Sequence, residues 1–404
     1  MQGNRVQIPE GLREYMGQEA YQKMEVQAQL RKNFRLFGYD EIQTPSFEYA
    51  AVFEGQIGFD RQDKMIRFFD TDGRTLVLRP DFTMPVGRMA AARREELPSP
   101  ARLFYIGSAF GLEHDYGHQR REFTQAGAEL LGAADYSADA EMIALAIESM
   151  ASMGLKQFSV DLGHVGFFMA LTAQSGLNRA QAGMLRRMID SKNTAEAQDY
   201  LADMGLSKER MQNLLALIGL YGGQEVLEEA NRFGGLQCEK ALADLRGICK
   251  LLTAFGFGGH ITIDLGQLPD IDYYTGQVFR GMADGLGYPI LSGGRYDGVL
   301  GLFGRPMAAT GFALGVERAL AALDAGGQGT AMPAIACLIG AAPGYESDAY
   351  ALAAQLRAEG RRAIMALHTG EAELMAEGIR LGAEGIAFCS RAGQGIKAIE
   401  GGGK

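Results

Sequence analysis

Cysteines are few in this sequence, and their spacing suggests neither a metal site nor a set of disulfides. The four cysteines among 404 residues are Cys238, Cys249, Cys337 and Cys389, and no two of them form a Cys-x-x-Cys pair. Such pairs are the usual sign of zinc binding, and disulfide frameworks belong to short secreted chains that are dense in cysteine. We therefore expect no metal site and no disulfide framework.

Long apolar runs and targeting segments are also missing. No run of apolar residues approaches the roughly 20 that a membrane-spanning helix needs. The first residues, MQGNRVQIPEGLREYM, do not contain the apolar segment of a signal peptide. We expect a cytoplasmic protein without a membrane partner.

Positive charge is the third scarcity. Lys and Arg number 39 against 49 Asp and Glu, so the formal net charge is -10. The basic runs, such as Arg93-Arg94, are no longer than two residues. Because an acidic chain does not attract a polyanion through its overall field, we expect no nucleic-acid partner. The length and the 47% hydrophobic content predict two or three domains with sizeable cores.

Residues 102–132 have the pattern of two strands joined by a polar loop. In the second strand, Phe123, Gln125, Gly127 and Glu129 share one face, and the opposite face is formed by small and apolar residues: Thr124, Ala126, Ala128 and Leu130. We expect the apolar face to lie on the core and the two polar side chains to form a pocket floor. The alternation by itself is equally typical of a half-solvated antiparallel strand.

This stretch resembles motif 2 of the class II aminoacyl-tRNA synthetases of the histidyl type. That motif reads Phe-Arg-x-Glu, a loop, and then an Arg-x-Phe-x-Gln strand that ends in Glu. The matching positions here are Phe110, Glu113, Arg121, Phe123, Gln125 and Glu129. The arginine of the motif is absent, because its position is occupied by Gly111.

Two stretches resemble the rest of the amino-acid pocket of that family. Arg79-Pro80-Asp81-Phe82-Thr83 matches Arg-Pro-Glu-x-Thr, in which the carboxylate and the hydroxyl meet the α-amino group. Taken alone, Thr83 is also a suitable cap for the helix predicted over residues 86–94. Asp272-Tyr273-Tyr274-Thr275-Gly276 matches the family signature Arg-Gly-Leu-Asp-Tyr-Tyr-Thr-Gly, but Pro269-Asp270 replaces its leading Arg-Gly.

Motifs 1 and 3 of the family have counterparts as well. The helix predicted over 19–37 and the extended segment 39–45 resemble motif 1, which implies a homodimer through this region. Residues 309–318 resemble motif 3, a strand of small residues followed by a helix that bears Arg318. In the synthetases that arginine lies against ATP, so here Arg318 is expected either to pair with a carboxylate or to bind an anion.

The resemblance implies an α+β fold. Residues 1–325 are expected to form a class II synthetase-like antiparallel sheet flanked by helices, with a helical insertion at about 179–254. After the glycine-rich linker 325–329, residues 331–404 alternate between strand and helix patterns, which predicts a small α/β C-terminal domain. The synthetases place their anticodon-binding domain there, but these strands carry no basic face, so we do not assign tRNA binding to them.

The departures from the family concern the reaction rather than the pocket. Amino-acid adenylation is an in-line displacement promoted by positioned cations, and the histidyl family uses one arginine from motif 2 and one from the tyrosine signature. Both positions are lost here, to Gly111 and Pro269. Since each loss costs roughly 10²–10⁵ in rate, we expect a protein with no catalytic residues and no cofactor.

A retained pocket without the reaction resembles the regulatory subunits of ATP phosphoribosyltransferase, paralogues of histidyl-tRNA synthetase that act in histidine biosynthesis. In that family the chain is not catalytic: it assembles with a short catalytic subunit, activates it and relays feedback by histidine. The implied histidine site consists of Asp81, Thr83, Arg121, Gln125, Glu129, Tyr273 and Tyr274. Two alternatives remain open: a histidyl-tRNA synthetase with displaced arginines, and a free-standing synthetase-like module that binds an amino acid.

Overall fold

The computed structural model describes residues 6–53, 65–115, 118–269, 273–366, 370–393 and 395–399, and only the backbone of 112–115 and 118–119. The chain forms two compact units, residues 1–329 and 330–404. The motif residue Asp272 lies outside the described residues, as do Asp270, which replaces the glycine of the motif, and the side chain of Glu113.

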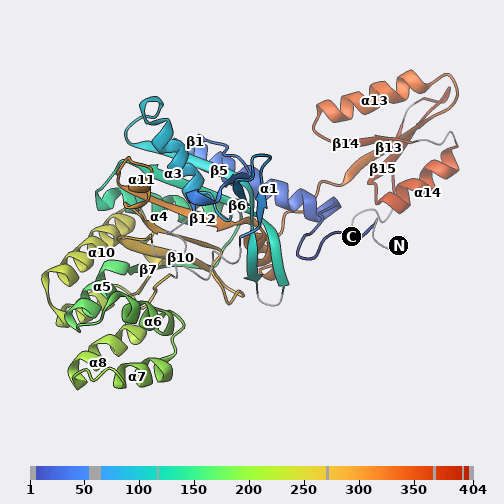
Figure 1. Ribbon diagram of the computed structural model, residues 1–404. Helices are drawn as coiled ribbons and strands as arrows, with labels where there is room; N and C mark the ends of the chain where they lie inside the picture. The colour runs from blue at the N-terminus through green and yellow to red at the C-terminus, as the bar shows by residue number, and fades with distance from the viewer. Residues whose placement is uncertain are drawn as a thin grey trace. The chain divides into compact units, whose positions relative to one another are not determined.

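A nine-stranded sheet is the centre of the first unit (Figure 1). All neighbouring strands are antiparallel except the pairs β1–β5 and β7–β9. In spatial order the strands are β1 (Asp40–Glu41), β5 (Ala101–Asp115), β6 (His118–Leu131), β12 (Ala309–Gly315), β11 (Leu291–Arg295), β10 (Gln277–Ala283), β7 (Phe158–His164), β9 (Ile261–Asp264) and β8 (Tyr221–Gly222).

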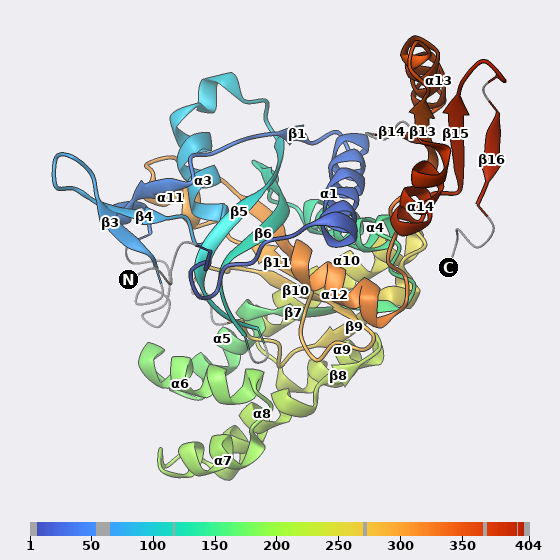
Figure 2. The same ribbon diagram turned by 90° about the vertical axis from the view of Figure 1, so that its right-hand side faces the viewer.

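Helices cover both faces of this sheet and create a separate core on each side (Figure 2). The larger core contains Ala126, Ala128 and Leu130 of β6, which pack against α1 (Gly17–Leu36), α4 (Tyr136–Ser152), α5 (Val165–Gln174), α10 (Leu236–Ala254) and α12 (Val316–Ala325). The smaller core contains Tyr105 and Phe123, which pack against α3 (Thr83–Ala92) and α11 (Val299–Leu302). Since β6 is covered on both faces, it is not the half-solvated strand that its alternation would allow.

A separate three-stranded antiparallel sheet precedes α3 in the chain. It consists of β2 (Phe47–Tyr49), β4 (Thr75–Leu78) and β3 (Arg67–Phe69) in this spatial order. Short 3₁₀ turns follow β2 and α3 at Ala50–Val52 and Arg94–Glu96. The guanidinium of Arg79 follows β4 and is held by carbonyl oxygens of Thr44, Pro45 and Ser108.

The predicted insertion is helical, as expected. Its elements are α6 (Arg179–Asp190), α7 (Thr194–Ala202), α8 (Lys208–Ala216), α9 (Glu225–Glu229) and α10, with 3₁₀ turns at Leu217–Gly219, Ala230–Phe233 and Gly258–His260. In Figure 1, α6, α7 and α8 form one group of helices beyond α5.

The second unit contains a four-stranded sheet with a helix on each face. The spatial order is β14 (Arg362–Met365), β13 (Ile335–Ala341), β15 (Gly385–Cys389) and β16 (Ile396–Ala398). Helices α13 (Glu346–Ala358) and α14 (Glu371–Leu381) pack on opposite faces, in two separate clusters of buried residues. The first three strands are parallel, as the alternating pattern predicts, and β16 is an additional antiparallel strand.

The α+β, class II synthetase-like fold predicted from the sequence is confirmed, with three local corrections. The β5–β6 hairpin is longer than predicted, because backbone pairing continues to Asp115 and His118 in the segment expected to be a loop. The glycine-rich sequence of residues 293–298 is typical of a turn, but Gly293 and Gly294 lie within β11. Thr83 does not cap α3, since the N-cap position is Phe82 and the backbone N–H of Met84 points to Asp81 Oδ1 at 3.5 Å.

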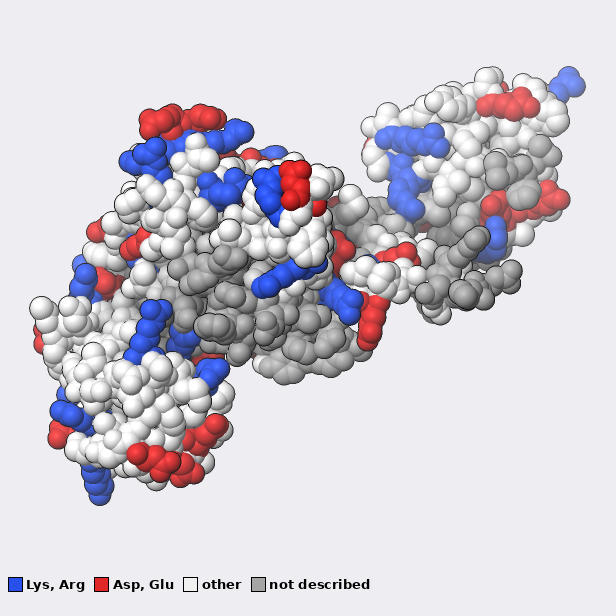
Figure 3. Space-filling model, viewed as in Figure 1, with Lys and Arg blue, Asp and Glu red and all other residues white. Residues whose placement is uncertain are grey.

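Surface charge is mixed on the face shown in Figure 3, where basic and acidic side chains of the described residues are interspersed. Within the described part of the chain, no helix is both long enough and apolar enough to cross a membrane.

Candidate functional site

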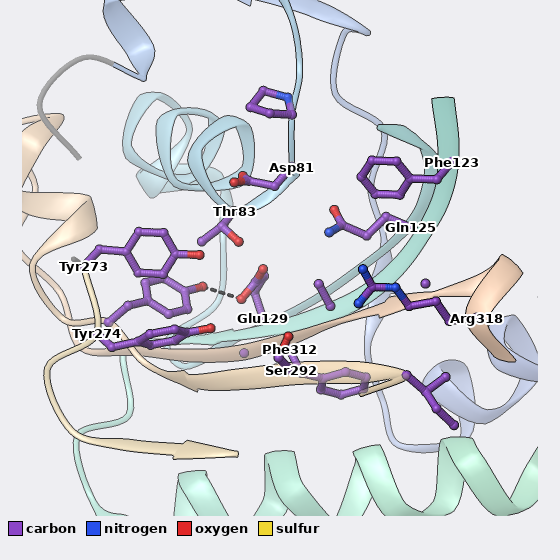
Figure 4. A pocket seen from close by; sticks show the side chains of 16 residues that line it. Asp81, Thr83, Phe123, Gln125, Glu129, Tyr273, Tyr274, Ser292, Phe312 and Arg318 are labelled. Atoms are coloured by element: carbon purple, nitrogen blue, oxygen red, sulfur yellow. Dashed lines mark hydrogen bonds between the residues drawn. The ribbon is translucent and has the colours of Figure 1, made fainter. Parts of the chain in front are cut away.

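A cavity of about 170 Å³ lies on the α3 side of the large sheet, where β6, β11 and β12 form its floor (Figure 4). This volume is below the roughly 300–1,000 Å³ of sites for drug-sized ligands, so it suits a small metabolite. Its lining residues come from five parts of the chain: Pro80, Asp81, Thr83; Phe123, Gln125, Glu129; Tyr273, Tyr274; Ile290, Ser292, Tyr296; and Gly311, Phe312, Ala313, Gly315, Arg318.

The cavity brings together most of the site residues that the sequence analysis named. The lining includes Asp81, Thr83, Gln125, Glu129, Tyr273 and Tyr274, and also the candidate anion-binding residue Arg318. Arg121 is the exception. It is exposed and does not belong to the lining, although it lies on β6 two residues before Phe123.

Glu129 is the central polar residue of the cavity. Its side chain is 1% exposed. The hydroxyl of Tyr105 donates to Oε1 at 3.3 Å, and the hydroxyl of Tyr296 donates to Oε2 in a short hydrogen bond. Figure 4 shows Glu129 between Tyr273 and Tyr274 on one side and Gln125 and Arg318 on the other. The two hydroxyl groups therefore hold the carboxyl group of Glu129 between the tyrosine side of the cavity and the side that contains Gln125 and Arg318.

Two glycines make this arrangement of side chains possible. A Cβ atom on Gly311 of β12 would come within 1.7 Å of Glu129 Oε2. A Cβ atom on Gly127 would come within 2.4 Å of the hydroxyl of Tyr105. Glycine is therefore required at both positions, because the carboxyl group of Glu129 lies directly over the backbone of β12 and the phenol of Tyr105 lies directly over the backbone of β6.

One wall of the cavity is formed by the chain leading into α3. Phe82 stacks on Tyr105 with ring centroids 4.2 Å apart, and the guanidinium of Arg79 lies 3.8 Å from the Phe82 ring centroid on this wall. The backbone N–H of Phe82 donates to Gln125 Oε1 at 3.2 Å, which orients that amide. The stack and the hydrogen bond hold Asp81 and Gln125 at the same end of the cavity.

Tyrosines form the opposite wall. Tyr273 is 8% exposed, and its ring lies 5.0 Å from that of Tyr274 and 5.8 Å from that of Tyr296. Thr83 lies beside Tyr273 and Glu129 in the lining of the cavity (Figure 4). Aromatic faces with hydroxyl groups at their edges suit a flat ring that also carries hydrogen-bonding atoms.

Arg318 is the single cation among the described residues that line the cavity. Its Nη1 donates to the carbonyl oxygen of Pro289 at 3.2 Å, and the guanidinium lies 5.8 Å from the ring centroid of Tyr288. The nearby Arg295 belongs to the scaffold, because it forms a two-pronged ion pair with Asp139 at 2.7 and 3.0 Å. Arg318 is therefore the described lining residue whose positive charge can attract an anionic group of a ligand.

Burial raises the pKa of Glu129 to about 8, although the hydrogen bonds from Tyr296 and Tyr105 oppose this shift. The negative charge that develops on Glu129 in turn contributes, after burial, to raising the pKa values of Tyr105 and Tyr296 well above their usual range. At neutral pH the carboxyl group of Glu129 is therefore largely protonated. A ligand with a positive charge would favour loss of that proton.

Replacing Glu129 with glutamine should remove a pH dependence of stability. Native Glu129 keeps a proton between about pH 4.5 and 8 that the unfolded chain releases, so the wild-type free energy of unfolding falls as the pH rises through this range. The difference between a pKa of 4.5 and one of about 8 corresponds to a loss on the order of 5 kcal/mol over the whole range. Urea unfolding at pH 5, 6.5 and 8 measures it.

The variant Glu122→Gln, at an exposed position of the same strand, is the control and should keep the wild-type profile. Parallel pH profiles for wild type and Glu129→Gln would contradict the raised pKa.

Two important residues of the site are not predicted by the sequence pattern. The pattern places Tyr105 in a strand and Tyr296 in a glycine-rich turn, and it indicates no site role for either. The register of the hairpin places Tyr105 opposite Gly127, so an aromatic residue paired with a glycine on the pocket face was the available signal. Tyr296 follows β11 directly, and no local pattern indicated that its hydroxyl reaches Glu129.

The described residues contain no group of three or more His, Cys, Asp or Glu side chains placed to hold a metal ion. All four cysteines are buried, and none forms a disulfide. The polar side chains that line the cavity carry carboxyl, amide, hydroxyl and guanidinium groups.

A family model described as histidyl-tRNA synthetase matches residues 11–319, which include every residue that lines the cavity. Curated relatives named ATP phosphoribosyltransferase regulatory subunit include one from Symbiobacterium thermophilum, 39% identical over 359 residues, which are 88% of this chain and 90% of that protein. Another, from Moorella thermoacetica, is 40% identical over 320 residues, which are 78% of this chain and 82% of that protein.

Solved structures agree with these relatives. A structure from Bacillus halodurans C, described as an ATP phosphoribosyltransferase regulatory subunit/histidyl-tRNA synthetase, superposes with a TM-score of 0.87 at 30% identity and covers 96% of this chain and 99% of that chain. Histidyl-tRNA synthetase from Nostoc sp. PCC 7120 superposes with a TM-score of 0.84 at 19% identity and covers 98% of this chain and 96% of that chain. At that identity the second likeness concerns the fold alone.

Proposed function

The chain belongs to the family of ATP phosphoribosyltransferase regulatory subunits, relatives of histidyl-tRNA synthetase, and from this premise we propose that it activates a separate catalytic subunit and senses histidine in the cavity. The observation that carries the proposal is a retained amino-acid cavity in a chain that has lost both arginines of the adenylation reaction, at Gly111 and Pro269. A regulatory subunit of this enzyme serves histidine biosynthesis.

Histidine matches the three chemical regions of the cavity. The α-ammonium group would lie at the end formed by Asp81 and Gln125, where a carboxylate gives a charge-assisted hydrogen bond. The imidazole ring would lie against Tyr273 and Tyr274, with the carboxyl group of Glu129 as a partner for a ring nitrogen. The carboxylate of the ligand would face Arg318, the cation among the described lining residues.

Loss of catalysis and retention of binding are consistent with this role. Adenylation needs cations around the α-phosphate, and the described lining offers one. Recognition of an amino acid needs only the groups described above. A ligand that prefers one state of an assembled complex shifts the population of that state, so a binding cavity is sufficient for a sensor.

The proposed assembly includes the short-form catalytic subunit of ATP phosphoribosyltransferase and a homodimer of this chain through α1 and β1. Exposed apolar side chains on α1, Met24 and Leu36, support an interface at that helix. A cytoplasmic location, without nucleic-acid or membrane partners, belongs to the same proposal.

Mixing the purified chain with the short catalytic subunit of the same organism should raise the rate of phosphoribosyl-ATP formation on the order of tenfold or more, and added histidine should suppress this rate. The assay starts from ATP and phosphoribosyl pyrophosphate, and each subunit alone is the control. Light scattering after size exclusion reports the dimer and the complex. If mixing changes neither the rate nor the mass, the chain is better explained as a free-standing amino-acid-binding module.

A further inference from the structure

The segment that carries Tyr273 and Tyr274 is held in place by the helical insertion. Asp190, the last residue of α6, accepts a hydrogen bond from the backbone N–H of Leu268 to Oδ1 at 2.8 Å. The same carboxylate forms an ion pair with Arg280 of β10, with Nη2 at 2.9 Å from Oδ1 and 3.0 Å from Oδ2. Leu268 precedes the tyrosines and Arg280 follows them. We call the chain on these two sides of the tyrosines the upstream and downstream stems of the segment. The side chain of Asp190 therefore contacts both stems.

A second ion pair supports the upstream stem. Lys192 Nζ lies 2.7 Å from Asp264 Oδ1, and the same oxygen accepts from the backbone N–H of Gly266 at 2.9 Å. The backbone N–H of Leu265 donates to the carbonyl oxygen of Leu220, which also belongs to the insertion. The upstream stem is therefore anchored to the insertion at three points within five residues.

The turn between α6 and α7 is shaped to make these contacts. Lys192 has a φ of 56°, the single positive value for a non-glycine residue among those described. Such a conformation is unfavourable for a residue with a Cβ atom and persists where its surroundings hold it. Here the Lys192–Asp264 ion pair and the hydrogen bond from Leu268 to Asp190 provide those surroundings.

We propose that Asp190 is a positioning residue through which docking of α6–α8 on the sheet and ligand binding between Tyr273 and Glu129 are coupled. This inference rests on the proposal that histidine binds in the cavity. When α6 is docked, Asp190 holds the two stems together and keeps both tyrosines against the cavity. Because coupling of two equilibria is reciprocal, a ligand in the cavity must also favour the docked insertion.

The coupling gives the insertion a role in regulation. A partner that contacts α6–α8 would change the affinity of the cavity for histidine without touching it, and histidine would change the affinity for that partner by the same factor. The insertion carries no part of the cavity lining, so its effect would pass through the stems of the tyrosine segment.

The test measures histidine binding to the full chain by calorimetry and hydrogen exchange of the amides in residues 179–216. In Asp190→Ala, histidine should bind about tenfold more weakly. Asp190→Asn keeps an acceptor for the N–H of Leu268 but loses the ion pair with Arg280, so its defect should be smaller. Asp199→Ala, at an exposed carboxylate of α7, is the matched control and should bind as the wild type does.

Hydrogen exchange separates positioning from a general loss of stability. Histidine should slow exchange in α6–α8 of the wild type and of Asp199→Ala but not of Asp190→Ala, at temperatures well below each thermal midpoint. If histidine binds to the wild type and Asp190→Ala binds it equally well, or exchange in α6–α8 does not respond, the coupling is wrong while the histidine site stands. If histidine does not bind to the wild type, both proposals fall.

Discussion

Replacing Asp81 with alanine is expected to weaken histidine binding about 30- to 100-fold. Asp81 lines the end of the cavity beside Gln125, where we place the α-ammonium group of the ligand. Removing one partner of a hydrogen-bonded charge pair costs roughly 2–5 kcal/mol, and the lower part of this range applies because Asp81 is only half-buried. Isothermal titration calorimetry of the purified chain measures the change.

The matched control is Asp81→Glu, which restores the acid that the histidyl-tRNA synthetase family uses at this position. It keeps the charge and should keep binding within a few-fold of the wild type. Removal of the carboxylate also removes an acceptor near the N–H of Met84 at the start of α3, so the thermal midpoint of each variant must be measured. Unchanged affinity in Asp81→Ala would place the ammonium group, or the ligand itself, elsewhere.

No histidine-dependent exchange between ATP and pyrophosphate is expected from the purified chain. The two positions that supply arginines in the synthetases are Gly111 and Pro269, neither of which carries a charge. Each lost cation costs roughly 10²–10⁵ in rate, so two losses lower it by at least about 10⁴-fold. The measurement follows labelled pyrophosphate into ATP at saturating histidine.

A histidyl-tRNA synthetase assayed in parallel shows that the conditions support exchange. The calorimetric affinity for histidine, obtained on the same preparation, shows that its cavity is intact. Exchange at a rate within a few-fold of that synthetase would mean that other residues replace the missing arginines, and the chain would then be an enzyme despite its family.

These two expectations describe a protein that binds histidine but does not catalyse its adenylation. Glu129 remains buried beneath the site with hydroxyl donors from Tyr105 and Tyr296, and Gly311 leaves the space that its carboxyl group occupies. The pocket therefore keeps a precise shape for a small ligand. The surrounding arginines, Arg79 and Arg295, hold carbonyl and carboxylate groups of the scaffold rather than facing a phosphate.

Local patterns in the sequence were sufficient for much of the fold. The alternation of β6 predicted which of its faces packs into the larger core, because the two-residue period of a strand is a local property. Gly38 at the end of α1 has a φ of +80°, the conformation that makes glycine common after a helix. The longer hairpin and the strand β16 were not predicted, since strand pairing depends on partners distant in the chain.

By itself the sequence determined the family, the presence of Gly111 and Pro269 where the resemblance places two arginines, and seven of the residues that line the cavity, because these depend on residue types at fixed spacings. Only the tertiary structure decided how these groups act on one another. It buries Glu129, raises its pKa to about 8, brings Tyr296 to it from 167 residues away, and joins Asp190 to both stems of the tyrosine segment. Burial and long-range contacts arise only when distant segments pack together, and no local pattern of residues contains them.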